Sequence, residues 1–229
     1  MPSDLPLRCA ACAARSTALC DGLDDRTLTA LHHIGRRRRL RAGQVFGWIG
    51  DPASHCANLV SGVLKVSRVE ADGGVQIVGL LYPGDFVGTL FADRSADTIA
   101  ALSDADLCVY PRRALEEMLV SHPVAGRVLL RRTLATLGEV RRWTPMLARA
   151  RADARVAALL LDMARRSGVD GDDVFRLPLP RGAMAEALGL AVETVSRHMT
   201  AFRQDGLIAL SGLRGVRLID RMRLAHIAA

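Results

Sequence analysis

The stretch AEALGLAVETVSR, which begins at Ala185, is the part of the sequence that most constrains the fold. It follows the pattern A-x-x-L-G-L-x-x-x-T-V-S-R, in which Ala185 is small enough for two helices to cross and Gly189 supplies a tight turn. We therefore predict two short helices, over 181–190 and 191–207. Residues 208–220 read as a hairpin, and these elements together make a winged helix-turn-helix.

The second of these helices presents a polar face. Glu193, Ser196 and Arg197 are spaced i, i+3 and i+4, so their side chains lie on one side and can enter the major groove of DNA together. Arginine bonds guanine bidentately, glutamate accepts from a cytosine amino group, and serine reaches either base edge. Glu193 and Arg197 are also spaced for an intrahelical ion pair, which would orient the arginine. Ala191, just before the helix, offers no side-chain oxygen to cap it.

Residues from about 36 to 110 are rich in Val, Ile and Gly. Short apolar runs alternate there with the turn sequences GDP, ADGG and YPGD, and this spacing predicts an antiparallel barrel or roll. Asp72-Gly73 is the clearest hairpin turn. The apolar runs are VFGWI, CANLVSGVLKVSRV, VQIVGLLY and DLCVY.

Helical patterns flank this region. The segment 24–35 indicates a short helix capped by Asp24 or Asp25, and we interpret its pair His32 and His33 as surface side chains rather than metal ligands. A much longer helix is predicted over 123–151, and its apolar stripe requires a partner, either the chain's own roll or a second copy. Inside it, Pro145 is expected to kink or interrupt the helix. The stripe consists of Val128, Leu130, Leu134 and Leu137.

Composition favours a binding protein over an enzyme. The formal charge of +7 and pI of about 9.9 suit an anionic partner, although arginines on a long helix also form solvated faces. The phosphate-binding glycine loop, G-x-S-x-G and H-E-x-x-H are all absent from the sequence. We find neither a secretion signal nor an apolar run long enough for a membrane span, so we expect a cytoplasmic protein.

Cysteines cluster at the N-terminus. Cys9, Cys12 and Cys20 have the spacing C-x2-C-x7-C, while Cys56 and Cys108 stand far downstream. In a reducing compartment such a cluster more often binds metal or senses redox state than forms structural disulfides. The spacing by itself leaves zinc, an iron–sulfur cluster, a thiol switch and free thiols open.

The roll, the long helix and the LGLAVETVSRHM stretch together resemble the CRP/FNR superfamily of transcription regulators, over nearly the whole chain. The resemblance implies an α+β fold: an antiparallel, cupin-like β-roll as sensor, a long dimerisation helix, and a C-terminal winged helix-turn-helix. Its implied parts are a cysteine-containing leader (1–22), the sensor roll with flanking helices (23–122), the dimerisation helix (123–151) and the DNA-binding domain (152–229).

Within this superfamily the recognition helix resembles the FNR branch, because V-E-T-x-S-R runs from Val192 to Arg197. The resemblance implies a palindromic promoter site close to TTGAT-N4-ATCAA. It also implies a homodimer that contacts RNA polymerase. In the segment that is similar to a cyclic-nucleotide cassette, Thr89 stands where a glutamate would hold the ribose, and we interpret Arg94 as a surface residue.

The resemblance also implies a role for the thiols. It implies a [4Fe–4S] cluster held by Cys9, Cys12, Cys20 and Cys108, with Cys56 packed in the roll. Loss of the cluster in oxygen would then weaken the dimer and its binding to DNA. Zinc-dependent, thiol-redox and cyclic-nucleotide-responsive regulation are the alternatives.

Overall fold

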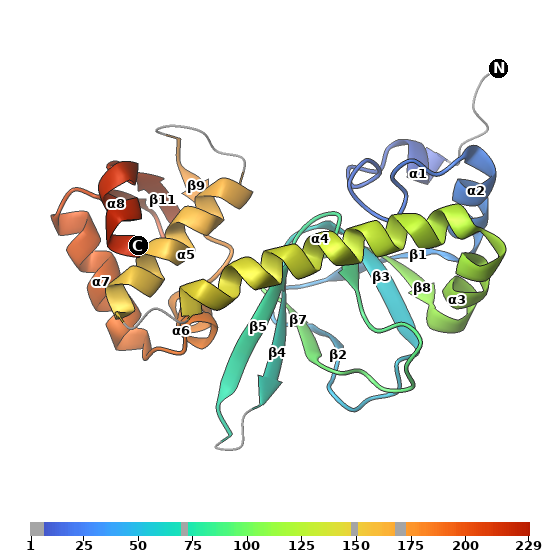
Figure 1. Cartoon of the computed structure of the whole chain (residues 1–229), viewed down its shortest axis with the longest axis horizontal. Coiled ribbons are helices and arrows are strands. Elements are labelled where there is room, and N and C mark those ends of the chain that lie inside the picture. The colour runs from blue at the N-terminus through green and yellow to red at the C-terminus, as the bar shows by residue number, and fades with distance from the viewer. Residues whose placement is uncertain (1–6, 70–72, 148–150, 168–172) are drawn as a thin grey trace. The chain divides into compact units, whose positions relative to one another are not determined.

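The computed structural model describes residues 7–69, 73–147, 151–167 and 173–229. The chain divides into two compact units (Figure 1). The first consists of Met1–Gly73 with Val78–Glu139, and the second of Gly74–Ile77 with Val140–Ala229. Among the described residues, none of the helices combines the length and the apolar character needed to cross a bilayer.

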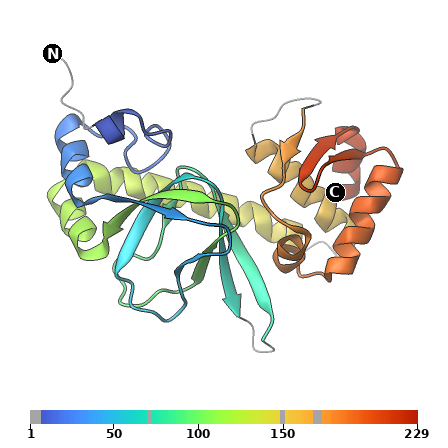
Figure 2. The same cartoon turned by 180° about the vertical axis from the view of Figure 1, so that it is seen from behind.

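The first unit is built on a β-roll of two four-stranded sheets, with strand orders β1-β8-β3-β6 and β2-β7-β4-β5. This confirms the predicted antiparallel roll (Figure 2). The predicted turn at Asp72 lies outside the described residues. The strands are β1 (Arg36–Leu40), β2 (Val45–Gly47), β3 (His55–Ser61), β4 (Leu64–Val69), β5 (Val75–Leu81), β6 (Phe86–Val87), β7 (Thr98–Ala101) and β8 (Ala105–Pro111).

The strands that lie outside the predicted apolar runs include β1 and β7. The first, β1, begins with four exposed arginines and buries only Leu40. It forms because its backbone pairs with β8 from Arg36 opposite Val109 to Leu40 opposite Ala105. The second, β7, is short and is held between β2 and β4. Partners distant in sequence thus impose both strands.

The central strands of the first sheet alternate between two environments. On one face, Leu59, Leu107 and Val109 pack into the core of the roll. On the other, Cys56 and Tyr110 are fully buried against the helices. This two-residue period is that of a sheet buried on both faces. The burial of Cys56 agrees with its predicted place in the roll.

Helices cover the outer face of this sheet. They are α1 (Leu7–Ala10), α2 (Asp25–Ile34), α3 (Arg112–Ser121) and α4 (Pro123–Leu147). The Asp24 carboxylate accepts a 2.8 Å bond from the backbone N–H of Thr27, so Asp24 rather than Asp25 caps α2. Leu28 and Leu31 of α2 pack in one cluster with Val128 of α4.

The long helix α4 continues through Pro145 to Leu147, so of the two predicted effects of Pro145, a kink or an interruption, the interruption does not occur. A proline leaves one carbonyl without its helical donor, but the flanking turns hold the helix. Residues 148–150, within the predicted 123–151 span, lie outside the described residues. Before the proline, α4 exposes an apolar stripe on the side away from the buried Val128: Leu130, Leu134, Leu137 and Val140.

The second unit is a winged helix-turn-helix, as predicted. Its three-stranded sheet has the order β10-β11-β9, so the predicted hairpin gains a third strand. The sequence of residues 152–168 predicts an amphipathic helix that ends at Gly168, and Gly168 lies outside the described residues. The elements are α5 (Ala152–Arg166), β9 (Phe175–Arg176), α6 (Arg181–Leu188), α7 (Val192–Gln204), β10 (Ile208–Ser211), β11 (Gly215–Leu218) and α8 (Arg221–Ala228).

The N-terminal segment is held against the roll at Gly84. This glycine has a φ of +99°, and a Cβ on it would lie 2.7 Å from the carbonyl oxygen of Thr17. The backbone of the leader therefore approaches the roll more closely than any other residue type would permit.

We predict that Gly84→Ala destabilises the first unit more than Gly43→Ala does. Gly43 has a similar φ of +86°, but a Cβ there would meet no atom within 4 Å. Each substitution carries the cost of a left-handed alanine, about 1–2 kcal/mol, and only Gly84→Ala adds the clash with Thr17. Urea unfolding of both variants measures the difference. Equal losses would show that the leader does not press on Gly84 in solution.

Candidate functional site

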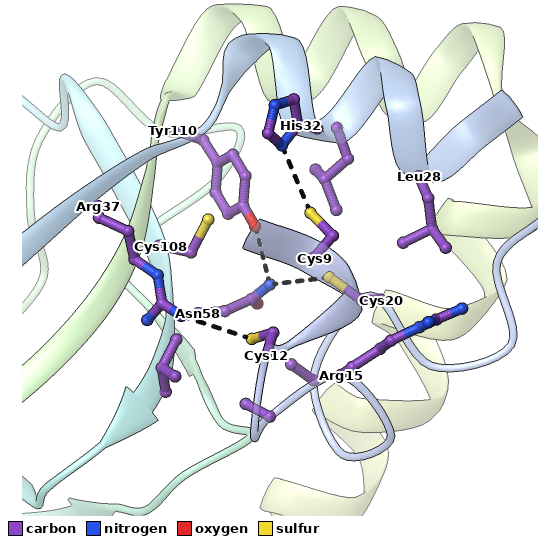
Figure 3. A pocket seen from close by; sticks show the side chains of 14 residues that line it. Cys9, Cys12, Arg15, Cys20, Leu28, His32, Arg37, Asn58, Cys108 and Tyr110 are labelled. Atoms are coloured by element: carbon purple, nitrogen blue, oxygen red, sulfur yellow. Dashed lines mark hydrogen bonds between the residues drawn. The ribbon is translucent and has the colours of Figure 1, made fainter. Parts of the chain in front are cut away.

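The structure brings four of the five cysteines around one pocket (Figure 3). Cys9 lies in α1, Cys12 follows it, Cys20 ends the loop that comes next, and Cys108 lies on β8. All four are partly buried, and no disulfide joins any of them in the described part of the chain. These are the four residues that the resemblance implied as ligands. Cys56 is fully buried and does not line this pocket.

Small apolar residues seat the leader on the roll. Ala14 and Ala18 are almost fully buried with Val60 of β3, and Cys12 and Cys108 pack against this cluster. Leu19 and Leu23 enter the larger cluster beneath α2, α3 and α4. The Ala-rich spacing between Cys12 and Cys20 thus lets the backbone lie close to β3, which carries Cys20 to the strands.

The floor of the pocket is one row of the first sheet. Cys108 pairs with Arg37 of β1 on one side and with Asn58 of β3 on the other, so the three side chains share a face. Asn58 Nδ2 donates to Tyr110 Oη at 3.1 Å and contacts Cys20 Sγ at 4.0 Å. Its Oδ1 atom is buried and has no hydrogen-bond partner.

Positive charge surrounds the thiols. Arg37 Nη2 lies 3.9 Å from Cys12 Sγ, and Arg15 also lines the pocket. His32 Nδ1 lies 3.5 Å from Cys9 Sγ, so His32 faces the thiols rather than being a surface side chain as predicted, whereas His33 is exposed. Of the lining residues, all of which the structure describes, none is an aspartate or a glutamate.

Burial and the neighbouring thiols disfavour ionisation of Cys20. Burial, and then repulsion by Cys108, Cys9 and Cys12, raises the pKa of Cys20 to about 12, while Arg15 acts in the opposite direction. Burial and the neighbouring thiols of Cys108 and Cys20 likewise hold the pKa of Tyr110 well above its usual value. A positive centre between the sulfurs would reverse this balance, because a metal-bound thiol is deprotonated.

Within the part of the chain that the structure describes, no three Cys, His, Asp or Glu side chains lie close enough to hold a single metal ion. The cavity between the four thiols has a volume of about 30 Å³. A group larger than a few atoms would therefore displace side chains that line the cavity. The donor set itself, four soft sulfurs with basic neighbours, fits an iron–sulfur cluster.

Residues 11–24, between α1 and α2, contain Cys12 and Cys20 and form the thiol loop. Ion pairs join this loop to α4. Asp21 Oδ2 accepts a 2.8 Å bond from Arg132 Nη2 and lies 3.3 Å from Arg131 Nη2. Arg132 Nη2 donates in addition to the carbonyl of Ser16 at 3.3 Å. Sequence reasoning did not single out Asp21, Arg132, Asn58 or Tyr110. The local signals that could have done so are that Asp21 directly follows Cys20 and that Tyr110 is two residues after Cys108.

A second cavity, of about 300 Å³, lies within the roll. Thr89 and Ser95 line it together with Arg38, Asp51 and Asp97, among others. Arg94 is not among the lining residues; it is exposed and donates to the carbonyl of Gly50 at 2.6 Å. The arginine next to the cavity is therefore turned to a backbone oxygen, as its interpretation as a surface residue anticipated.

In the second unit, α6 and α7 meet at Gly189, which adopts the left-handed conformation at φ 61° and ψ 46°. Ala185 and Val195 are buried where the two helices pack, whereas Leu190 is only half-buried. Ala191, the N-cap residue of α7, makes no side-chain capping bond. This is the geometry that the motif predicts.

The predicted reading face of α7 is accessible. Glu193 and Arg197 are exposed and Ser196 is partly exposed, while Val195 and Met199 pack inward. Both charged residues are described, and no ion pair joins them here. Arg197 Nη2 instead lies 3.3 Å from the hydroxyl of Thr194, one turn back. The arginine is thus oriented along its own helix and available to a base.

Comparison with known domains agrees with this architecture. Residues 154–227 match the Crp-like helix-turn-helix domain family, and residues 37–122 match the cyclic nucleotide-binding domain family. The solved structure of FixK2 from Bradyrhizobium japonicum superimposes with a TM-score of 0.77, at 28% identity over 86% of this chain and 98% of that chain.

Similar proteins are regulators of transcription. The chain is 39% identical over 223 residues to the transcriptional activator protein FnrL of Cereibacter sphaeroides, covering 95% of this chain and 90% of that protein. It is 32% identical over 226 residues to the nitrogen fixation regulation protein FixK of Bradyrhizobium diazoefficiens, covering 96% and 94%. These relatives confirm the prediction that the chain is not an enzyme.

We predict that Arg197→Met weakens binding to a duplex that carries TTGAT-N4-ATCAA by about 1–3 kcal/mol per half-site, because a bidentate guanine contact is lost. Binding to unrelated DNA should weaken much less. Fluorescence anisotropy of labelled duplexes measures both affinities. Arg223→Met, which removes an exposed charge from α8, is the control. Equal losses on both duplexes would assign Arg197 to a phosphate instead.

Proposed function

Because the chain belongs to the CRP/FNR family of transcription regulators, we propose that it is an oxygen-responsive DNA-binding regulator whose [4Fe–4S] cluster controls dimerisation. One observation carries this proposal: Cys9, Cys12, Cys20 and Cys108, which come from a leader and a distant strand, line a single pocket. The protein would act in the cytoplasm, where the DNA of a bacterium lies.

The pocket suits a thiolate-bound cluster in its chemistry and charge. The four cysteines would each supply one sulfur, and His32, Arg15 and Arg37 would face the assembly from the surrounding elements. When bound, the cluster would supply an oxygen-labile centre that joins the leader to β8. Asn58 and Tyr110 close the inner side of the pocket and keep Cys20 out of bulk water.

The second part of the proposal concerns assembly. The stripe of Leu130, Leu134, Leu137 and Val140 is 43–60% exposed, and pairing of two α4 helices would bury it. A homodimer of this kind would present two α7 helices to a palindrome such as TTGAT-N4-ATCAA, about one DNA turn apart. Glu193, Ser196 and Arg197 would then read bases in each half-site. RNA polymerase is the expected partner at the promoter.

There are three alternatives, of which two use the same cysteines. Zinc, or reversible oxidation of the thiols, would also occupy the four-cysteine pocket. A cyclic nucleotide would instead enter the cavity of the roll, which lies in the segment that matches the cyclic nucleotide-binding family. Metal analysis separates the first two from the cluster, and nucleotide binding tests the third.

We predict about four irons and four acid-labile sulfides per chain in protein purified without oxygen, with a brown colour that bleaches in air. Serine at any of the four pocket cysteines should abolish both, since each supplies one ligand. Cys56→Ala, at the fully buried cysteine outside the pocket, should retain them. A colourless wild type that carries zinc or no metal would contradict the proposal.

We also predict that Arg37→Met shortens the lifetime of the cluster in air, because a positive charge beside Cys12 stabilises the anionic assembly. Arg37→Lys keeps the charge and should restore most of the lifetime. The matched control is Arg39→Met on the same strand, whose guanidinium pairs with Asp104 at 3.5 Å. Absorbance decay after addition of air-saturated buffer is the measurement. Identical decay in all four proteins would remove Arg37 from this role.

A further inference from the structure

Asp21 lies between the four-cysteine pocket and helix α4, the two elements that the proposed function couples. It follows Cys20 directly in the chain, and its carboxylate lies against Arg131 and Arg132 in the middle of α4. The segment around α1 and the loop after it lies beside the N-terminal half of α4 in both views (Figures 1 and 2). The position of this carboxylate is therefore set by the thiol loop, while its partners belong to the helix that would pair in a dimer.

The described hydrogen-bond acceptors of the Arg132 side chain lie in the thiol loop. Its Nη2 donates to Asp21 and to the carbonyl of Ser16, both in that loop. Its Nε is buried without a hydrogen-bond partner, and its side chain is only 29% exposed. A guanidinium in this environment is costly unless a carboxylate neutralises it. The loop thus provides the neutralising charge as well as a contact.

Arg131 lies beside the exposed apolar stripe of α4. It stands next to Leu130 and three residues before Leu134 on the exposed apolar stripe, with its side chain 66% exposed. In a pair of helices joined along that stripe, Arg131 flanks the seam, where charges decide whether helices attract or repel. Asp21 places a negative charge at this point of an otherwise basic stretch of α4, which also contains Arg127.

We propose that Asp21 is the positioning residue through which the state of the four thiols controls pairing of α4. With Cys20 and Cys108 tied to one centre, the backbone at Cys20 is fixed, and Asp21 stays beside Arg131 and Arg132, where its single negative charge offsets part of their positive charge. Without that tie, the loop gains conformational freedom and Asp21 leaves the arginines for part of the time. Two α4 helices then meet with uncompensated positive charge beside their apolar seam. This inference rests on the proposed function.

The test measures the dimer dissociation constant with and without iron. Wild type, Asp21→Asn and Asp25→Asn are purified without oxygen and analysed by sedimentation equilibrium, first loaded and then after air, chelation and thiol reduction. Asp25 is an exposed carboxylate in the first turn of α2 and serves as the charge-matched control. Iron and sulfide assays on each sample verify loading.

We expect loading to tighten the wild-type dimer, and Asp21→Asn to reduce that tightening about fivefold, as two partly exposed ion pairs would. Asp25→Asn should match wild type. Iron-free Asp21→Asn should differ much less from iron-free wild type, because the carboxylate lies beside the arginines there for only part of the time. A further variant, iron-free Arg131→Gln, should form a tighter dimer than iron-free wild type.

Equal weakening of loaded and iron-free Asp21→Asn would overturn the coupling and leave Asp21 as a structural residue. If Asp21→Asn changed the dimer dissociation constant of neither the loaded nor the iron-free protein, and the assays showed that iron was bound, the coupling would also be overturned. The proposed function would still stand. A wild type that binds no iron would overturn the proposed function itself and the coupling with it, and metal analysis reveals this before any variant is compared.

Discussion

The packing of the N-terminal leader against β3 and β8 is the contact on which the rest of the site depends. Ala14 and Ala18 are buried with Val60, and the carbonyl of Thr17 lies where a side chain on Gly84 would be. Small residues on both sides permit this approach, because each larger side chain would hold the two backbones apart. Without the contact, Cys20 and Cys108 would belong to separate parts of the molecule.

Charged side chains around this contact are divided between the thiol pocket and helix α4. The pocket gathers four thiols with Arg15, Arg37 and His32 and has no acidic lining residue, whereas the nearest carboxylate of the loop, Asp21, is directed to α4. Positive charge thus faces the sulfurs and negative charge faces the arginines of the helix. Since charges interact more strongly where water is partly excluded, the loop is well placed to respond to a change at the thiols.

Local pattern predicted much of the molecule. The Gly189 turn, the polar face of α7, the wing and the β-roll follow from spacing and turn chemistry, because their determinants lie within a few residues of one another. Local pattern did not reveal what distant partners decide. Backbone pairing with β8 makes a strand of the arginine run in β1. His32 turned inward because Cys9 lies against α2.

By itself, the sequence determined which residue types were available: three clustered cysteines, a distant fourth, and a helix that carries Glu193, Ser196 and Arg197. Only the tertiary structure decided that Cys108 shares a sheet row with Arg37 and Asn58, and that Asp21 lies against Arg131 and Arg132. The reason is physical. Helix and turn preferences act over a few residues. The row of side chains across β1, β8 and β3 forms only after distant segments have packed, and so does the contact between the leader and the roll.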